Sequence, residues 1–318
     1  MKVTVVGAGG NVGSTVALSV AQRDFAKEVV AVDLERKDGD KTFYPSKGRA
    51  LDQWEASPIH LFDTRVKGTV DYADTANSDV CVITAGVPRR PGMSRDDLLE
   101  INANIVSSVS KELVKYSPDT ILIVVSNPLD VMVQVAKDAS GLPYEKVMGM
   151  AGILDTARYR AFIADELGVS PKDIQALLMG GHGDTMVPLP RFTTLSGMPI
   201  THFIKEERLE EIVNRAKKGG GEIVGLMGTS AWYAPGAAAA QMVEAILLDQ
   251  NRIFPVCAHI DGEYGIDDLY IGVPVKLGKG GIKEVIEVEL TEKEQELLDA
   301  SAKAVRGTLE EFKALMNK

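Results

Sequence analysis

The stretch Val3-Thr4-Val5-Val6-Gly7-Ala8-Gly9-Gly10-Asn11-Val12-Gly13 decides the fold, and a helical pattern follows it over residues 14–22. A β-branched run, a glycine turn and a helix, in this order, are the context in which glycines indicate dinucleotide binding. Glycines permit a tight turn, and a pyrophosphate then lies on the amides of the helix N-terminus. The spacing is Gly7-x-x-Gly10-x-x-Gly13 rather than Gly-x-Gly-x-x-Gly, and such a motif alone often marks only a turn.

A carboxylate follows the next predicted strand, at residues 28–32. Asp33 lies 20 residues after Gly13, where a carboxylate can hydrogen-bond the ribose hydroxyls of a dinucleotide and repel a 2′-phosphate. This favours NAD over NADP, although the basic pair Arg36-Lys37 leaves a phosphate contact open. Residues 37–48 are polar and interrupted by glycine and proline, which predicts a surface loop.

Further apolar runs at residues 80–83 and 121–125 predict buried strands that alternate with helices. Such a pattern is typical of a parallel sheet covered on both faces, with ligands bound beyond the carboxyl ends of its strands. We therefore expect an α/β protein with a Rossmann doubly wound parallel sheet over residues 1–148. A second, mixed α/β substrate-binding domain is expected over residues 149–318.

Composition limits the possible partners. The net charge of −10 argues against a general nucleic-acid or anionic-membrane partner. Cys81 and Cys257 are far apart and fit neither a disulfide framework nor a metal motif, which favours a reducing, cytoplasmic compartment. The sequence shows no signal peptide pattern and no apolar run of about 18 residues that would predict a membrane span.

The stretch Gly180-Gly181-His182-Gly183-Asp184 is the strongest candidate for catalysis. Histidine can take up and return a proton near neutral pH, although an isolated motif of this kind is at least as often a turn around a buried histidine. Asp155 and Arg158 lie three apart and so share one face of a predicted helix. A surface ion pair would explain them too, but a histidine base needs a carboxylate and a carboxylate substrate needs an arginine.

Three arginines lie in the stretch over residues 86–95, among glycines and prolines, which suggests a cationic lid over an anionic substrate. In the second half, Gly219-Gly220-Gly221 follows a charged helical pattern and predicts a break or flexible joint. Thr291 to Glu294 predicts a capping box, and the final helix places Leu298, Ala302, Val305, Leu309 and Phe312 on one stripe. The other three histidines are expected to be bystanders.

These segments together resemble the lactate/malate dehydrogenase family, and within it the lactate-dehydrogenase-like malate branch. The resemblance runs along essentially the whole chain, and several motifs in one order are far more specific than any one of them. The motifs are Val6 to Gly13, Thr84-Ala85-Gly86, Pro91-Gly92-Met93-Ser94-Arg95, Val125-Ser126-Asn127-Pro128, Leu154-Asp155-Thr156-Ala157-Arg158 and Gly180 to Asp184.

The resemblance implies roles for the polar residues. His182 would accept the hydroxyl proton as malate gives hydride to NAD, and Asp155 would orient and stabilise the imidazole. Arg158 would clamp the carboxylate beside the reacting carbon, and Arg95 would polarise the carbonyl as the lid closes. Arg89 stands where lactate enzymes usually carry glutamine, so it would pair with the second carboxylate of malate or oxaloacetate.

The resemblance also implies NAD as cofactor, no metal, and a homo-oligomer, either dimer or tetramer. Asn127 would hydrogen-bond the substrate beside the nicotinamide. The expected cofactor-binding residues are Gly7, Gly10, Asn11, Val12, Gly13, Asp33, Asn102, Val125 and Asn127. Ala231 matches a position where lactate enzymes often carry threonine, which fits the malate branch.

Two alternatives stay open at this point. A lactate or other 2-hydroxy-acid dehydrogenase would share the site, and Arg89 is the residue that discriminates against it. A catalytically silent NAD-binding protein would keep the fold without the chemistry. The presence of His182, Asp155, Arg95 and Arg158 favours an active enzyme over a silent one.

Overall fold

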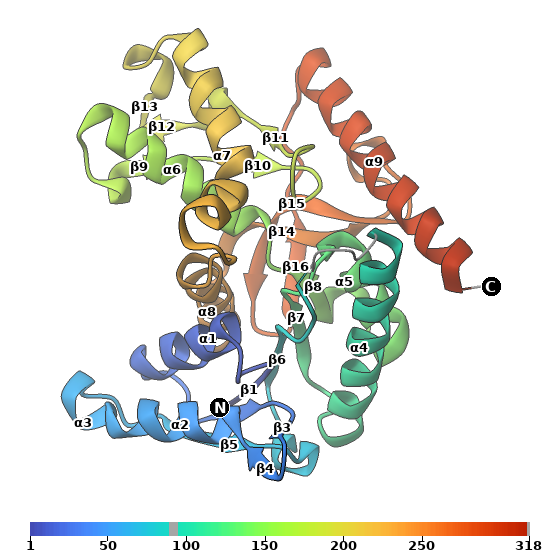
Figure 1. Cartoon of the computed structure of the whole chain (residues 1–318). Coiled ribbons are helices and arrows are strands. Elements are labelled where there is room, and N and C mark those ends of the chain that lie inside the picture. Colours follow the sequence, from blue (N-terminus) through green and yellow to red (C-terminus); the bar gives the residue numbers. More distant parts are fainter. Residues whose placement is uncertain (89–94, 317–318) are drawn as a thin grey trace.

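The computed structural model describes residues 1–88 and 95–316 of the chain. One sheet joins its lower half, which carries the N-terminus, to its upper half (Figure 1). Among the described residues, nine strands form this sheet in the order β16-β15-β14-β8-β7-β6-β1-β2-β5. The expected α/β class is confirmed.

Six strands of the described chain run parallel and form the doubly wound part of the sheet. Taken in chain order, they neighbour one another as 3-2-1-4-5-6, with the reversal between β1 and β6, which is the order of dinucleotide-binding sheets. Strands β6 and β7 are buried throughout, which explains their unbroken apolar sequences. The six are β1 (Lys2–Val6), β2 (Glu28–Val32), β5 (Arg65–Thr69), β6 (Val80–Ile83), β7 (Ile121–Val124) and β8 (Val147–Gly149).

Helices cover both faces of the parallel strands and bury a separate core on each. Helices α1 (Asn11–Gln22), α2 (Pro45–Glu55) and α8 (Tyr233–Leu247) contribute to the first core, together with Val3 and Val5 of β1. Helices α4 (Arg95–Tyr116) and α5 (Leu129–Ser140) contribute to the second. The short helix α3 (Ser57–His60) follows α2.

Antiparallel strands extend the sheet into the second half of the chain. These are β14 (Arg252–Ile260), β15 (Leu269–Gly278) and β16 (Gly281–Val285), and β14 joins the parallel part where Cys257 pairs with Gly149 of β8. The predicted domain boundary, between residues 148 and 149, falls inside β8. The division into two domains remains a prediction, because the sheet runs without interruption across that point.

The upper half is completed by three long helices and several small strands. The helices are α6 (Gly152–Leu167), α7 (Glu206–Met227) and α9 (Glu292–Met316). The strands are β9 (Ile174–Gln175), β10 (Leu178–Met179), β11 (Val187–Pro188), β12 (Thr194–Leu195) and β13 (Met198–Pro199). Short 3-10 helices occur in both halves of the described chain. They are η1 (Tyr72–Thr75), η2 (Tyr144–Lys146), η3 (Pro171–Asp173), η4 (Pro190–Phe192), η5 (Ile200–His202) and η6 (Glu263–Gly265).

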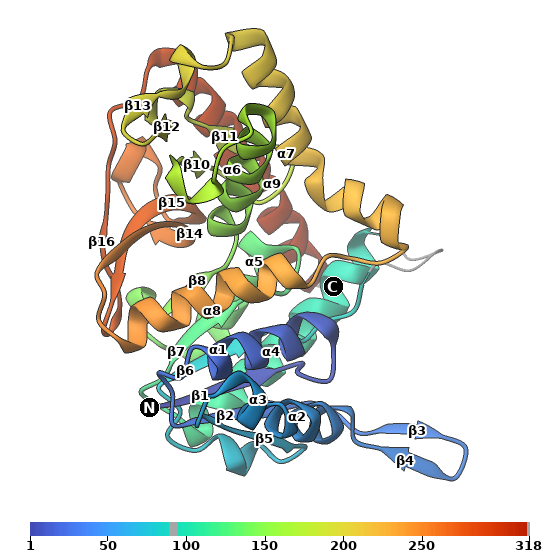
Figure 2. The same cartoon turned by 90° about the vertical axis from the view of Figure 1, so that its left-hand side faces the viewer.

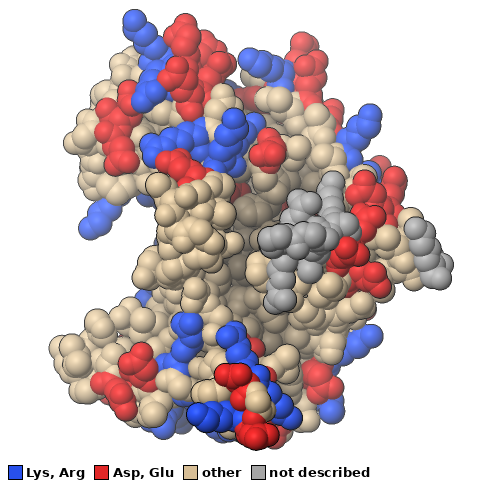
Figure 3. Space-filling view, viewed as in Figure 1, with Lys and Arg blue, Asp and Glu red and all other residues tan. Residues whose placement is uncertain are grey.

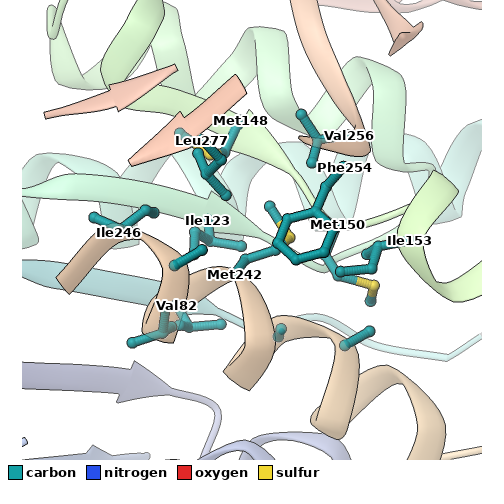
Figure 4. Close-up of a cluster of buried hydrophobic side chains, with 14 of the residues drawn as sticks. Val82, Ile123, Met148, Met150, Ile153, Met242, Ile246, Phe254, Val256 and Leu277 are labelled. Atoms are coloured by element: carbon teal, nitrogen blue, oxygen red, sulfur yellow. The ribbon is translucent and has the colours of Figure 1, made fainter. Parts of the chain in front are cut away.

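The core is continuous between the halves. Side chains of the parallel strands meet those of β14, β15 and α8 in one buried cluster (Figure 4). Met150 lies beside Phe254 and Ile153, and Met148 lies beside Leu277, so flexible thioethers fill irregular space at two places in this core. This shared packing fixes the position of the upper half relative to the glycine turn at residues 7–13, which is called the nucleotide loop below.

Two expectations from the sequence are wrong. Gly219-Gly220-Gly221 does not interrupt its helix, because α7 runs continuously through these residues. Residues 37–48 are not a plain loop: β3 (Arg36–Asp38) and β4 (Lys41–Phe43) form a two-stranded hairpin, and α2 begins at Pro45. The hairpin projects away from the body of the protein (Figure 2).

The C-terminal helix forms as expected. In its capping box, Thr291 N–H donates to Glu294 Oε2 (2.8 Å) and Glu294 N–H to Thr291 Oγ1 (3.3 Å). Leu298, Ala302 and Val305 of the predicted stripe are buried, while Leu309 and Phe312 pack partly against the second core.

An isolated bridge ties the loop that carries His182 to the large sheet. Gly180 and Gly272 exchange two backbone hydrogen bonds, of 2.8 Å and 3.1 Å. A Cβ on Gly272 would lie only 2.3 Å from the carbonyl oxygen of Gly180, so no other residue fits there without moving the loop.

We predict opposite effects for two glycine-to-alanine substitutions. Gly272→Ala should lower the free energy of unfolding by about 1–3 kcal/mol, because the new methyl group collides with backbone. Gly307→Ala should raise it by up to about 1 kcal/mol, because Gly307 lies inside α9 with open space around it. Urea unfolding followed by circular dichroism checks both, and equal effects would contradict the account of the bridge.

Candidate active site

His182 lies on the short loop between β10 and β11. The backbone φ angle is positive at Gly180 (83°) and at Gly183 (133°), so the chain turns sharply on both sides of the histidine. Residues other than glycine rarely adopt a backbone conformation with such a positive φ angle. The glycines around His182 therefore shape the loop, as the sequence suggested.

Two side chains from distant helices hold the backbone of this loop. Gly181 N–H donates to Ser301 Oγ of α9 (2.8 Å), and His182 N–H donates to Asp130 Oδ2 of α5 (3.1 Å). Sequence reasoning missed both anchors, which lie 120 and 52 residues from their partners. The only available signal was the position of Asp130, just beyond the carboxyl end of β7.

Asp155 links His182 to Arg158. His182 Nδ1 lies 2.9 Å from Asp155 Oδ2, and Arg158 Nη1 donates to Asp155 Oδ1 (3.2 Å). Asp155 is only 2% exposed and lies in the first turn of α6, where the helix dipole favours a negative charge. With Nδ1 bound to Asp155, Nε2 is the ring nitrogen left to exchange a proton with a ligand.

The pKa of His182 is raised above its ordinary value. Burial alone would lower this pKa, but the carboxylates of Asp155 and Asp130 favour the imidazolium and outweigh both burial and the opposing charge of Arg158. The geometry thus stabilises the protonated ring that a general base forms when it accepts a proton.

Gly219 of α7 makes room for Arg158, and Gly220 lies beside the same side chain. A Cβ on Gly219 would lie 3.1 Å from Cδ of Arg158, and one on Gly220 would lie 3.7 Å from its Nη2. The Nε of Arg158 is buried without a hydrogen-bond partner among the described residues. The small residues of α7 therefore let the guanidinium lie against the helix and beside the site.

A cavity of about 350 Å³ brings these residues together with the nucleotide loop. The protein surface is hollowed near the middle of this face (Figure 3). Val12, Val125 and Asn127 line the cavity from the lower half, and Asp155, Arg158, His182, Lys217, Gly220, Gly221 and Ala231 are among the residues that line it from the upper half. Lys217 was not singled out from the sequence.

The nucleotide loop has the features of a phosphate cradle. Gly7 has a positive φ (86°), and a Cβ on Gly13 would lie 2.5 Å from the Gly7 carbonyl oxygen. Gly10 caps α1 without any side-chain acceptor, which leaves the first amides of the helix available to an anion. Asn11 begins α1, and its Oδ1 accepts from Arg49 (2.9 Å).

Asp33 braces the same loop. Its Oδ2 accepts a hydrogen bond from Gly9 N–H (2.7 Å). A Cβ on Gly9 would lie 2.7 Å from that oxygen, so the glycine that departs from the usual spacing is required by this contact. Contact of Asp33 with a ribose remains a prediction.

Asn102 is a buried clamp beneath the site. Its Oδ1 accepts from Val87 N–H (2.8 Å), and its Nδ2 donates to the carbonyl oxygens of Val87 (3.2 Å) and Asn127 (2.8 Å). These bonds tie α4 to the loops after β6 and β7. Asn102 thus positions the backbone beside the cofactor site, while a direct contact with cofactor stays a prediction.

Two predicted arginines cannot be placed. Arg89 lies outside the described residues, and Arg95 is the first residue of α4, with a side chain that also lies outside the described part. Within residues 1–88 and 95–316 there is no group of three or more His, Cys, Asp or Glu side chains arranged to hold a metal. No helix in those ranges has the length and apolarity to cross a membrane.

The two halves match two parts of one family. Residues 1–149 match the lactate/malate dehydrogenase NAD binding domain, and residues 153–316 match its alpha/beta C-terminal domain. The chain belongs to the lactate/malate dehydrogenase family. Membership agrees with the observed strand order and with the constellation around His182.

Individual relatives are similar along the whole length. The chain is 62% identical to "Malate dehydrogenase" of Salinibacter ruber, over 99% of this chain and 98% of the relative. The solved structure of malate dehydrogenase from Salinibacter ruber superposes with a TM-score of 0.93 at 60% identity, covering 100% of this chain and 99% of that one. A lactate dehydrogenase of Cryptosporidium parvum, solved with lactic acid and cofactor, gives a TM-score of 0.91 at 39% identity, covering 100% and 98%. Fold similarity alone therefore does not separate the two activities.

We predict that Asp155→Asn lowers the pKa of His182. The amide removes the charge that favours the imidazolium, so the ring should lose its proton at lower pH than in the parent protein. An NMR titration of the His182 ring protons measures this without any substrate. Asp165→Asn, an exposed carboxylate on the same helix, is the control and should leave the midpoint unchanged.

Proposed function

We propose that this member of the family is an NAD-dependent malate dehydrogenase, which interconverts malate and oxaloacetate. The observation that carries the proposal is the chain of contacts from His182 through Asp155 to Arg158, in one cavity with the nucleotide loop. Two relatives that are 62% and 59% identical, over 98% and 96% of their own lengths, are malate dehydrogenases, which supports the same substrate.

The glycine turn and the cavity wall next to it would together hold NAD. A pyrophosphate would lie over Gly7, Gly10 and Gly13 on the open N-terminus of α1, and Asp33 would face the adenosine ribose. Val12 and Val125 would line the path toward the reacting end of the cofactor. When bound, NAD takes up the hydride that leaves the hydroxyl-bearing carbon of malate.

His182 would handle the proton of the reaction. The hydroxyl proton of malate passes to Nε2, and Asp155 stabilises the resulting imidazolium while holding the ring through Nδ1. In the reverse direction the imidazolium returns that proton to the oxygen of oxaloacetate. The raised pKa of His182 favours the protonated form that this direction requires.

Arginine side chains would hold the substrate. Arg158 would bind the carboxylate next to the reacting carbon, since its guanidinium reaches the cavity while one nitrogen bonds Asp155. Arg95 would stabilise charge developing on the carbonyl oxygen. Arg89 would pair with the second carboxylate, and Asn127 would add a hydrogen bond.

Two alternatives remain relevant to the proposal. A lactate dehydrogenase would use the same His182 chemistry with a smaller substrate, and a solved lactate dehydrogenase shares the fold. A silent NAD-binding protein would have no reason to keep an arginine and a histidine on one buried carboxylate, so the geometry favours the enzyme.

We also propose a homo-oligomer, a dimer or tetramer, in the cytoplasm. Support comes from large apolar side chains that are exposed at the end of α3, at the end of α7 and at the start of α8: Ile59 (79%), Leu61 (85%), Leu226 (80%) and Tyr233 (72%). Water-exposed apolar groups of this size favour a protein contact. Light scattering after size exclusion measures the mass in solution, and a monomer at micromolar concentration would contradict this.

Substrate choice tests the role of Arg89. NADH oxidation with oxaloacetate should exceed that with pyruvate by about a hundredfold or more, because an unpaired arginine against the methyl group of pyruvate is costly. Arg89→Gln should erode this preference. If the parent protein prefers pyruvate, the malate assignment fails. If NADH is not oxidised with any small 2-keto acid that is tested, the protein is catalytically silent.

Lys217 offers a second test, on a described residue. It lines the cavity and has no ion pair within the described part of the chain, so its charge attracts the doubly negative substrate. Lys217→Gln should lower kcat/KM for oxaloacetate about threefold to tenfold and weaken its dependence on salt. The matched control is Lys218→Gln, because Lys218 is exposed and should change little. If both substitutions lowered kcat/KM equally, the net charge of the protein, and not the position of Lys217 in the cavity, would explain the effect.

A further inference from the structure

Asp130 is a carboxylate that the reaction described above leaves without a role. It lies in the first turn of α5, at the base of the loop that carries His182. Its Oδ2 accepts the His182 N–H at 3.1 Å, while its Oδ1 is buried and has no hydrogen-bond partner among the described residues. Gly181 is held against α9 on the other side, because a Cβ there would lie only 2.8 Å from Val305 Cγ2.

Anchoring alone does not require a carboxylate. The neighbouring amide, Gly181 N–H, is held at 2.8 Å by the neutral hydroxyl of Ser301. An asparagine at position 130 could accept the His182 N–H equally well, and a neutral amide is less costly to bury than a charge. The distinguishing property of Asp130 is therefore its charge.

The surroundings of Asp130 act on that charge in both directions. Burial is the largest effect and raises the pKa of Asp130, while the positive charge of His182 and the hydrogen bond from His182 N–H oppose that rise by favouring the ionised form. The α5 N-terminus adds to this support. Cys257 is buried on β14, and its own pKa is raised by burial first and by the charge of Asp130 second, so it is a neutral thiol.

We propose that Asp130 is a second positioning carboxylate for His182, which fixes the backbone of the histidine and stabilises the imidazolium through its charge. The role rests on the proposed function, in which that imidazolium forms during each turnover. Asp155 acts on the ring itself at Nδ1, whereas Asp130 acts from the backbone side of the same residue.

The other charged groups around His182 are few within the described chain. Asp155 and Arg158 face it from α6, Asp130 from α5, and Lys217 lines the same cavity from α7. The two carboxylates raise the pKa of the ring and Arg158 lowers it. Removing the Asp130 charge leaves one carboxylate to oppose the effect of Arg158, so the pKa of His182 should fall.

The test compares Asp130→Asn, which removes a charge but keeps an acceptor for His182 N–H, with Ser301→Ala, which removes a neutral anchor of the same loop. An NMR titration of the His182 ring in the full chain should show the midpoint of Asp130→Asn lowered by about one unit, a tenfold loss of proton affinity. Ser301→Ala should keep the parent midpoint. The pH above which oxaloacetate reduction declines should move down in Asp130→Asn only.

Three outcomes would overturn the proposal: a parent-like midpoint in Asp130→Asn, an equal fall in Ser301→Ala, or a midpoint that rises. If Asp130→Asn does not fold, Asp130→Ser is the second variant, because it removes the charge with a smaller polar side chain and leaves His182 itself unchanged. It should lower the midpoint by less than Asp155→Asn does, and an unchanged midpoint would count against the proposal.

The titration also separates this proposal from the enzymatic one. It needs no substrate, so a protein inactive with oxaloacetate but showing the Asp130→Asn shift would refute the malate assignment alone. An active enzyme without the shift would refute the role of Asp130 alone.

Discussion

The 2.9 Å contact between His182 Nδ1 and Asp155 Oδ2 is the interaction on which the rest of the site depends. It selects the ring nitrogen that faces the cavity, and it joins the β10–β11 loop to α6. A carboxylate that is 2% exposed is costly to bury unless its oxygens are engaged, and here both are, by His182 and Arg158. His182, Asp155 and Arg158 thus form one electrostatic unit, which the proposed function uses as base, positioning carboxylate and substrate arginine.

That unit is held by contacts that have little to do with chemistry. Ser301 and Asp130 hold two successive amides, Gly180 is bonded to Gly272, and the α7 glycines leave space for Arg158. Each contact restricts the conformations of the loop in advance, so less conformational entropy is lost when a ligand binds. Such preorganisation is how a protein supplies catalysis through position rather than through unusual groups.

The sequence predicted those features in which a short motif carries its own geometry. The glycine turn gave the nucleotide loop, the spacing of Asp155 and Arg158 gave a shared helix face, and Thr291 with Glu294 gave the start of α9. It failed where the reason lies far away in the chain. The sequence Gly219-Gly220-Gly221 suggests a helix break, but α7 is continuous there and Arg158 packs against its first two glycines. Nothing in the residues near Ser301 indicates that its hydroxyl anchors the His182 loop.

The sheet that runs through both halves has a mechanical consequence. Hydrogen-bonded strands resist bending across their length, and β14 and β8 share both a backbone pairing and a common core. A swing of the lower and upper halves about a hinge would have to break this pairing and open the shared core. The sheet thus holds the strand that precedes the glycine turn and the strand that is bonded to Gly180, next to His182, in one continuous layer.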